Sequence, residues 1–442
     1  HVYTSVWFSA IYLLLFISLI GCIVPRIVSH AKALRRQPPR VPARLDRLAA
    51  HASMTTSASA AEVSQRAQQW LTSHRYRFVV DDDGSLRAEA GRHRETGNLV
   101  FHIFLVFVLV GVGWNTLWGF KGTSVVVEGQ GFSNSITQYD EFKAGAMVDT
   151  DNLTPFSMKL RKFVVSFETG TVQRGAARSF DATVDLTMGG KTQTRDLQVN
   201  HPLRIGSTKV HLLGHGYAAD VVVRDGDGKV AYSGPVVFLP QDANFKSVGV
   251  IKAPDARPDR LAFQGFFLPT GAITAGGPTS LFPDALNPQL YLTAWYGKPT
   301  VETGVPSNIY TLDTTGLTQV TNGKDKARFV LSPGQRYKLP DGKGSIQFNG
   351  WQRWAKIQVS QNPGLPLTFL SVVLSVAGLC VSLFSRSRRV WVRTIPGDDG
   401  LRVEIGGLDR SDSRSGAVDD VNSLLAALHG DSMSGDVGEE HS

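Results

Sequence analysis

Three long runs of apolar residues without a charged side chain divide the sequence. They cover residues 2–24, 98–120 and 365–385. A helix of about 20 apolar residues rises about 30 Å, which is the thickness of the hydrocarbon core of a bilayer. The pattern therefore predicts a multi-pass membrane protein with three transmembrane helices in this sequence.

The pattern changes between the second and third runs. Residues 121–364 consist of short β-branched and aromatic stretches that are separated by Gly-Gly, Asp-Gly and Pro-Gly. These dipeptides are typical of tight turns between antiparallel strands. We expect a large, mainly β domain here, either a sandwich or two small sheets.

Two polar segments flank the spans. Residues 25–97 begin with a Pro/Arg-rich linker, and the pattern then predicts a helix over 61–74 and a strand, a turn at Gly84 and a second strand. We interpret this segment as a small adaptor. Residues 386–442 form a tail with a short amphipathic helix over 417–430 and an acidic end that we expect to be disordered.

Basic residues in these two flanking segments indicate the orientation, because loops rich in Lys and Arg stay in the cytoplasm. Residues 25–97 and 386–442 are therefore predicted to be cytoplasmic, and residues 121–364 external to the plasma membrane. Trp7, Trp114 and Trp118 would then lie at the external ends of their spans, where indole rings favour the headgroup layer. The basic residues that carry this prediction are Arg26, Lys32, Arg35, Arg36, Arg40, Arg44, Arg47, Arg92, Arg94, Arg386, Arg388, Arg389 and Arg393.

This orientation places His1 outside, and the chain begins without Met. We therefore expect a fourth span upstream of His1. A signal peptide is a poorer interpretation of residues 2–24, because they lack a basic beginning and a small-residue cleavage site.

Charge and cysteine content exclude other classes. The formal net charge is +8, but the densest basic clusters flank the spans, where topology and anionic lipid explain them. We therefore predict no nucleic-acid partner. The two cysteines, Cys22 and Cys380, lie inside spans, so the external domain has no disulfide framework. Thiol-reducing chemistry, if the function needs it, would come from another membrane protein.

Several short motifs in residues 121–364 imitate functional sites. The stretch DGDGKVAY from Asp225 begins like a calcium loop, and MGGKT resembles a phosphate loop, but both lie between predicted strands and are interpreted as turns.

His211 and His215 lie four apart in a predicted strand, which separates the rings by about 13 Å. Metal or haem ligation by His201, His211 or His215 is the less favoured alternative, and no catalytic residue is predicted. We expect Trp351 and Trp354 to pack against the membrane surface or a partner.

His102 differs from these, because an ionisable side chain inside a span is costly and commonly functional. Three roles are open. The imidazole can hydrogen-bond a neighbouring helix, act in a proton relay, or serve as an axial ligand of haem iron. A relay usually needs a carboxylate, and the three spans contain no Asp or Glu. The site would lie near the cytoplasmic end of the span.

Three stretches together resemble the ResB-type (CcsB-like) cytochrome c biogenesis proteins of System II. They are GRHRETGNLVFHIFLVFVLVGVGW, LQVNHPLRIGSTKVHLLGHGYA and VSQNPGLPLTFLSVVLSVAGLCVSLFSRSRRVWVR. The resemblance covers most of residues 1–393. The family has four spans, which agrees with the expected upstream span.

The resemblance implies a function in haem transport. Proteins of this family work with a ResC/CcsA-like membrane protein, carry haem b outward and attach it to apocytochrome c. The span histidine of the family corresponds to His102, which implies that His102 is an axial ligand of the haem iron. The tryptophan-rich haem motif of the partner is absent, so the chain is expected to be a subunit of a cytochrome c haem lyase and not an enzyme alone. The alternative is a membrane scaffold whose β domain binds a partner or the apocytochrome, without haem ligation.

Overall fold

The computed structural model describes residues 5–299, 310–385, 387–397, 400–409 and 415–429. The chain forms two compact units. The first combines His1–Trp114 with Gly364–Ser442, and the second is Asn115–Pro363. The first unit holds the long helices and a small domain, and the second is rich in strands. The predicted acidic end, 431–442, lies outside the described residues.

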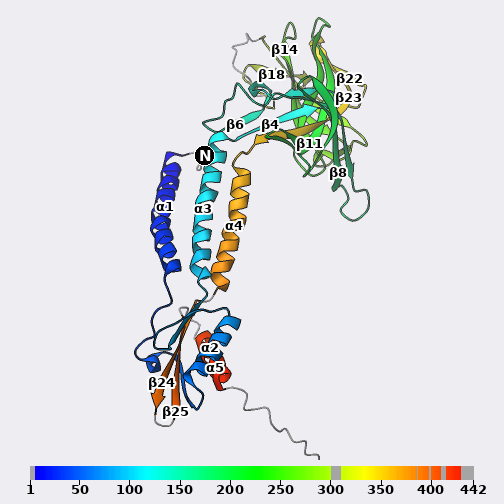
Figure 1. Ribbon diagram of the computed structural model, residues 1–442. Coiled ribbons are helices and arrows are strands. Elements are labelled where there is room, and N and C mark those ends of the chain that lie inside the picture. The colour runs from blue at the N-terminus through cyan, green and yellow to red at the C-terminus, as the bar shows by residue number, and fades with distance from the viewer. Residues whose placement is uncertain (1–4, 300–309, 386, 398–399, 410–414, 430–442) are drawn as a thin grey trace, which may run out of the picture. The chain divides into compact units, whose positions relative to one another are not determined.

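Three helices are long and apolar enough to span a membrane, which confirms the prediction from the hydrophobic runs. They are α1 (Val6–Arg35), α3 (His93–Trp118) and α4 (Leu365–Phe384), and they run alongside one another in Figure 1. Many of their apolar side chains are exposed, including Leu14 and Phe369, as expected of surfaces that face lipid. Helix α1 continues beyond the predicted end at residue 24, and α3 begins before residue 98, so both carry basic residues on their last or first turns.

Glycines set the contact between α3 and α4. A Cβ on Gly97 would lie 2.5 Å from the Ser382 nitrogen, and one on Gly378 would lie 2.8 Å from the Phe101 nitrogen. The Ser375 hydroxyl donates to the carbonyl of Phe101 at 3.3 Å. Small residues let two helix backbones approach closely in a membrane, where packing rather than the hydrophobic effect drives association.

Polar contacts join α1 to the side of α3 that faces away from α4. The hydroxyl of Tyr12 donates to the carbonyl of Leu109, and Arg26 forms a salt bridge with Glu95 at 2.9 Å. Tyr12 and Arg26 are as far apart in sequence as Glu95 and Leu109, so the two helices are antiparallel and keep one register over this length.

The small domain contains a five-stranded sheet with the order β1-β25-β24-β3-β2. Strands β24 and β25, which follow α4, lie between β1 and β3, which precede α3, so the predicted adaptor and tail build one domain. Helices α2 and α5 pack on the sheet around a shared apolar core that includes Leu71 and Leu424. The helix at 61–74, the turn at Gly84 and the C-terminal amphipathic helix are confirmed. The elements are η2 (Leu45–Arg47), β1 (Ala50–Thr56), α2 (Ala60–Ser73), β2 (Arg77–Val80), β3 (Leu86–Ala90), β24 (Arg388–Gly397), β25 (Gly400–Asp409) and α5 (Ser415–His429).

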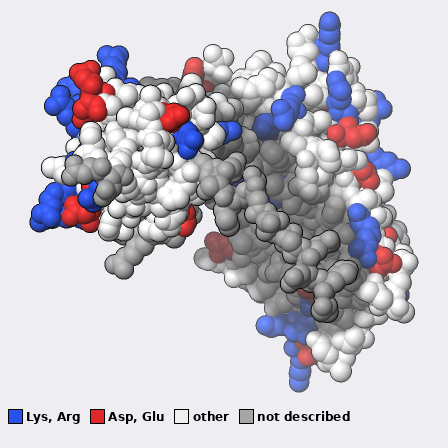
Figure 2. Space-filling model, turned by 60° about the horizontal axis from the view of Figure 1, so that its bottom comes forward, with Lys and Arg blue, Asp and Glu red and all other residues white. Residues whose placement is uncertain are grey.

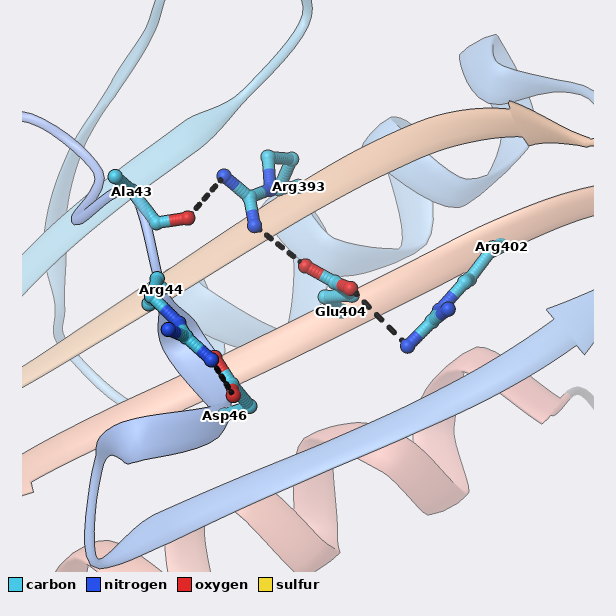
Figure 3. A network of polar contacts seen from close by, with 6 residues as sticks. All are labelled: Ala43, Arg44, Asp46, Arg393, Arg402 and Glu404. Carbon is cyan, nitrogen blue, oxygen red and sulfur yellow. Dashed lines mark hydrogen bonds and ion pairs between the residues drawn. The ribbon is translucent and has the colours of Figure 1, made fainter.

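A polar network holds the linker after α1 to this sheet (Figure 3). Arg393 on β24 donates to the carbonyl of Ala43 at 3.2 Å and forms a salt bridge with Glu404 at 2.6 Å. Arg402 lies 3.3 Å from the other oxygen of Glu404. The linker that follows α1 is therefore bound to strands that come after α4 in the sequence.

The second unit is almost entirely β. Nine strands follow the path β18-β17-β14-β13-β12-β11-β23-β4-β6, and β10, β21 and β22 pair beside it to give a twelve-stranded sheet. A four-stranded sheet has the order β5-β7-β8-β9. The bounds are β4 (Phe120–Val127), β5 (Gly131–Ser133), η3 (Ile136–Gln138), β6 (Glu141–Ala144), β7 (Ser157–Phe167), β8 (Ala177–Met188), β9 (Lys191–Gln198), β10 (Leu203–Ile205), β11 (Thr208–Arg224), β12 (Val230–Pro240), β13 (Ser247–Ala253), β14 (Arg260–Leu268), β15 (Gly271–Thr274), β16 (Gly277–Ser280), β17 (Gln289–Gly297), β18 (Leu317–Gln319), β19 (Thr321–Asn322), β20 (Asp325–Lys326), β21 (Arg328–Leu331), β22 (Arg336–Lys338), η4 (Pro340–Gly342) and β23 (Ser345–Gln361).

Two cores stabilise this unit. One lies between the four-stranded sheet and strands β4, β11 and β23, so two sheet layers pack together there. The other joins buried residues of β11 to those of β14, β17 and β23, which requires the large sheet to curl over on itself. The mainly β prediction is confirmed, and the sandwich-like arrangement stays a prediction.

The prediction for Trp354 was wrong. Its ring is only 4% exposed, and its indole N–H donates to the carbonyls of Tyr217 at 3.0 Å and Phe238 at 3.1 Å. It packs over Gly216, where any Cβ would collide with the ring. A buried indole needs a hydrogen-bond acceptor, and here the neighbouring strands supply it. Trp351 is also partly buried, edge-on to Tyr217.

Candidate functional site

His102 lies on α3, and its hydrogen bond determines which ring nitrogen is free. The Nδ1 atom is 2.8 Å from the carbonyl oxygen of Asn98, one turn earlier. A carbonyl only accepts, so Nδ1 must carry the proton and Nε2 of the neutral ring keeps its lone pair. Within the described part of the chain, Nε2 has no hydrogen-bond partner. The ring is partly exposed and meets Phe101 edge-on at 4.9 Å between centroids.

The position of His102 on α3 follows from the contacts between helices. Glu95, Leu109 and Gly113 all contact α1, and His102 falls on the same side at helical spacing. The α1–α3 register places Leu19 at the height of His102. The side of α3 that packs on α4, with Gly97 and Gly111, points the opposite way.

The surroundings of His102 bear on its three candidate roles. Over the described ranges, no three His, Cys, Asp or Glu side chains gather as a metal-binding group. The neighbouring positions on α3 are apolar. An imidazole with a free Nε2 is able to serve as an axial ligand of haem iron. The hydrogen bond to Asn98 is also the kind of contact that orients a ligating imidazole.

A polar cavity of about 800 Å³ adjoins this site at the end of the helices next to the small domain. Asn98 lines it, so the carbonyl-bearing residue that orients His102 also borders the cavity. The lining residues are Arg26, Ser29, His30, Ala33, Leu34, Arg36, Gln37, Pro39, Glu89, Gly91, Arg92, Arg94, Glu95, Asn98, Ser382, Ser387 and Arg389. They come from α1, α3, α4 and the small domain.

Two of the arginines in the cavity lining are paired. Arg26 forms its salt bridge with Glu95, and Arg92 lies 3.5 Å from Glu89 and donates to the carbonyl of Leu34. The three remaining arginines, Arg36, Arg94 and Arg389, have no carboxylate partner in the described ranges. The cavity therefore carries an excess of positive charge.

On the face shown in Figure 2, Lys and Arg are interspersed with Asp and Glu and form no continuous basic patch. Sequence reasoning attributed the arginines of the cavity to topology and missed the cavity, because no pattern reveals that residues 26–39, 89–98 and 382–389 meet.

The histidines of the β-rich unit form no site together. His201 is exposed, and its Nδ1 lies 3.3 Å from the carbonyl of Val199. His211 is half-buried in β11, and desolvation lowers its pKa. His215 is 9% exposed and stacks on Phe245 at 4.6 Å between centroids. Burial and then the charge of Arg353 lower the pKa of His215 to about 4, so the ring is neutral at physiological pH.

An ion pair between the buried Arg353 and the partly exposed Asp284, beside His215, also escaped prediction. The Arg353 guanidinium lies 2.7 Å from the Asp284 carboxylate and 5.0 Å from the centroid of Tyr217. Burial is the main cause of a raised pKa for Tyr217. The hydroxyl of Tyr217 donates to the carbonyl of Pro283 at 2.7 Å. Tyr217 belongs to the core that includes β14, β17 and β23, so these contacts indicate a structural role.

The chain is similar in sequence to several known proteins. A CcsB cytochrome c biogenesis protein of Synechococcus sp. (strain JA-3-3Ab) is 24% identical over 88% of this chain and 70% of its own length. The protein of the same name from Synechococcus sp. (strain WH7803) is 24% identical over 92% and 79%. Another from Picosynechococcus is 27% identical over 46% and 41%. The ResB-like family matches residues 1–418, and the chain belongs to this family of membrane proteins.

Proposed function

We propose that the chain is the haem-handling and scaffold subunit of a System II cytochrome c synthase in the plasma membrane. In this role it helps to move haem b across the membrane to a ResC/CcsA-like partner, which attaches the haem to apocytochrome c. Family membership and the names of the relatives, cytochrome c biogenesis protein CcsB, support a role in cytochrome c maturation.

The free Nε2 of His102 is the observation that carries this proposal. Its lone pair is available because Nδ1–H is held by the Asn98 carbonyl at 2.8 Å. That bond also prevents the ring from turning away and increases its basicity as a ligand. Iron bound to two axial nitrogens suits a haem in transit, since it leaves no open position for oxygen chemistry.

Other residues near His102 contact the haem without binding its iron. Phe101 and Phe104 on α3 provide apolar contact for the porphyrin or adjacent lipid. The second axial ligand is assigned to the partner, and among the described residues neither α1 nor α4 carries a histidine at the height of His102. The arginine clusters support a cytoplasmic small domain and an external β-rich unit. In that orientation haem would enter at the His102 end of α3.

The test compares two substitutions on the same side of α3. His102→Leu removes the ligand and preserves apolar bulk, and Val106→Leu, one turn further on, is the matched control. The complex with His102→Leu should assemble at normal size, lose most of its haem absorbance and leave c-type cytochromes absent. Val106→Leu should retain both. If the His102→Leu complex keeps its haem and matures cytochrome c, the chain acts as a scaffold without haem ligation.

A further inference from the structure

The cavity next to His102 has the charge, size and position of a binding site for the acidic edge of the haem. We propose that Arg36, Arg94 and Arg389 bind the two propionate carboxylates of a haem whose iron is ligated by His102. This inference rests on the proposed function. It identifies the ligand of the cavity as a pair of carboxylates.

The position of the cavity supports the assignment. Asn98 lines the cavity and accepts the hydrogen bond from His102, so imidazole and cavity share a residue. One helical turn separates His102 from Asn98, a rise of about 6 Å. The cavity is therefore near enough to His102 to receive one edge of a porphyrin whose iron His102 binds, and we assign it the propionate edge, which benefits from cations and water.

The charge of the cavity matches a dianion. The salt bridges of Arg26 with Glu95 and of Arg92 with Glu89 neutralise two arginines. Arg36, Arg94 and Arg389 remain, and no described carboxylate pairs with them. Two propionates would compensate most of this excess, and guanidinium groups bind carboxylates through paired N–H donors. A phospholipid phosphate carries a single charge and would leave more of the excess uncompensated.

The three arginines come from different parts of the first unit. Arg36 follows the end of α1, Arg94 lies in the first turn of α3, and Arg389 lies on β24, where it is registered opposite Glu89 of β3. The small domain thus contributes directly to the cavity. This gives a physical reason for building that domain from both ends of the chain, since its sheet positions Arg389 beside α3.

The experiment compares haem with its dimethyl ester, in which both propionates are uncharged. Each is titrated into the purified complex in nanodiscs without anionic lipid, and affinity is read from the haem absorbance. The wild-type complex should bind haem about fivefold to tenfold more tightly than the ester, which is the range of a charge-assisted hydrogen bond at a partly exposed site. Arg94→Gln combined with Arg389→Gln leaves only Arg36 of the three and should remove most of this preference, chiefly by weakening the binding of haem.

Arg35→Gln combined with Arg40→Gln is the matched control, because it removes two nearby exposed arginines that do not line the cavity. It should keep the wild-type preference. Arg94→Gln and Arg389→Gln are also measured singly, so that poor assembly of the double variant leaves the test intact, and the wild-type comparison needs no variant at all.

Equal binding of haem and ester by the wild type would overturn the proposal, as would an equal loss of both ligands in the double variant. Anionic phospholipid that co-purifies with the wild type but not with the double variant, without haem discrimination, would assign the cavity to a lipid headgroup instead. Failure of the proposed function has a different signature, since haem would then bind equally well to the wild type and to His102→Leu.

Discussion

Substitution of Gly97 by Ala tests how closely the backbones of α3 and α4 approach each other. The new Cβ would lie 2.5 Å from the Ser382 nitrogen and 2.6 Å from the Gly378 carbonyl oxygen, well inside an ordinary contact of 3.4 Å. Both atoms belong to the α4 backbone and have no rotamer to change. The helices must separate by about 1 Å, and overpacking of this kind costs about 1–3 kcal/mol.

Gly113→Ala is the matched control on the same helix. Its Cβ would meet only the Tyr12 hydroxyl, at 3.7 Å. Both substitutions share the higher helix propensity of Ala, so the difference between them isolates the packing cost. With a difference of about 2 kcal/mol, Gly97→Ala should melt about 4–8 °C below Gly113→Ala for a unit of 150–250 residues. Thermal unfolding of the purified chain in nanodiscs measures this, and equal midpoints would refute the close packing of α3 on α4.

Two further predictions concern orientation and the β-rich unit. In a background with Cys22 and Cys380 replaced by Ser, a membrane-impermeant thiol reagent should label Ser207→Cys but not Ser57→Cys in intact cells; equal labelling would contradict the orientation. His215 has a pKa near 6.5 when unfolded and about 4 when folded, so the unfolded state binds more protons between these values. Stability should therefore fall by up to about 3 kcal/mol as pH drops from 6.5 to 4. In thermal scans the wild type should lose more stability over this range than His215→Phe, and equal losses would show that the imidazole is not buried.

The sequence predicted the membrane helices well because composition alone determines which segments can enter a bilayer. It also predicted the mainly β character of residues 121–364 from turn residues and β-branched runs. It did not predict that β3 pairs with β24, because strands separated by about 300 residues leave no local pattern. For the same reason it placed Trp354 on a surface, since acceptors from β11 and β12 make its burial favourable.

The candidate site was also predicted only in part from the sequence. An imidazole in a span is conspicuous in any sequence, and that singled out His102. The helical spacing of four residues allows its hydrogen bond to the Asn98 carbonyl, but only the structure shows that the ring makes this bond. The cavity was beyond reach, because Arg36, Arg94 and Arg389 come together only through the packing of helices and sheet.

Replacement of His102 by Met tests the central claim most directly, since it exchanges one axial ligand for another. A thioether ligand in place of an imidazole raises the reduction potential of haem. We predict that the His102→Met complex retains haem, in a smaller amount than the wild type, with a clearly higher midpoint potential and an altered absorbance spectrum, and that His102→Leu retains almost none. Haem that is present in His102→Met with an unchanged potential and spectrum would show that His102 does not ligate the iron.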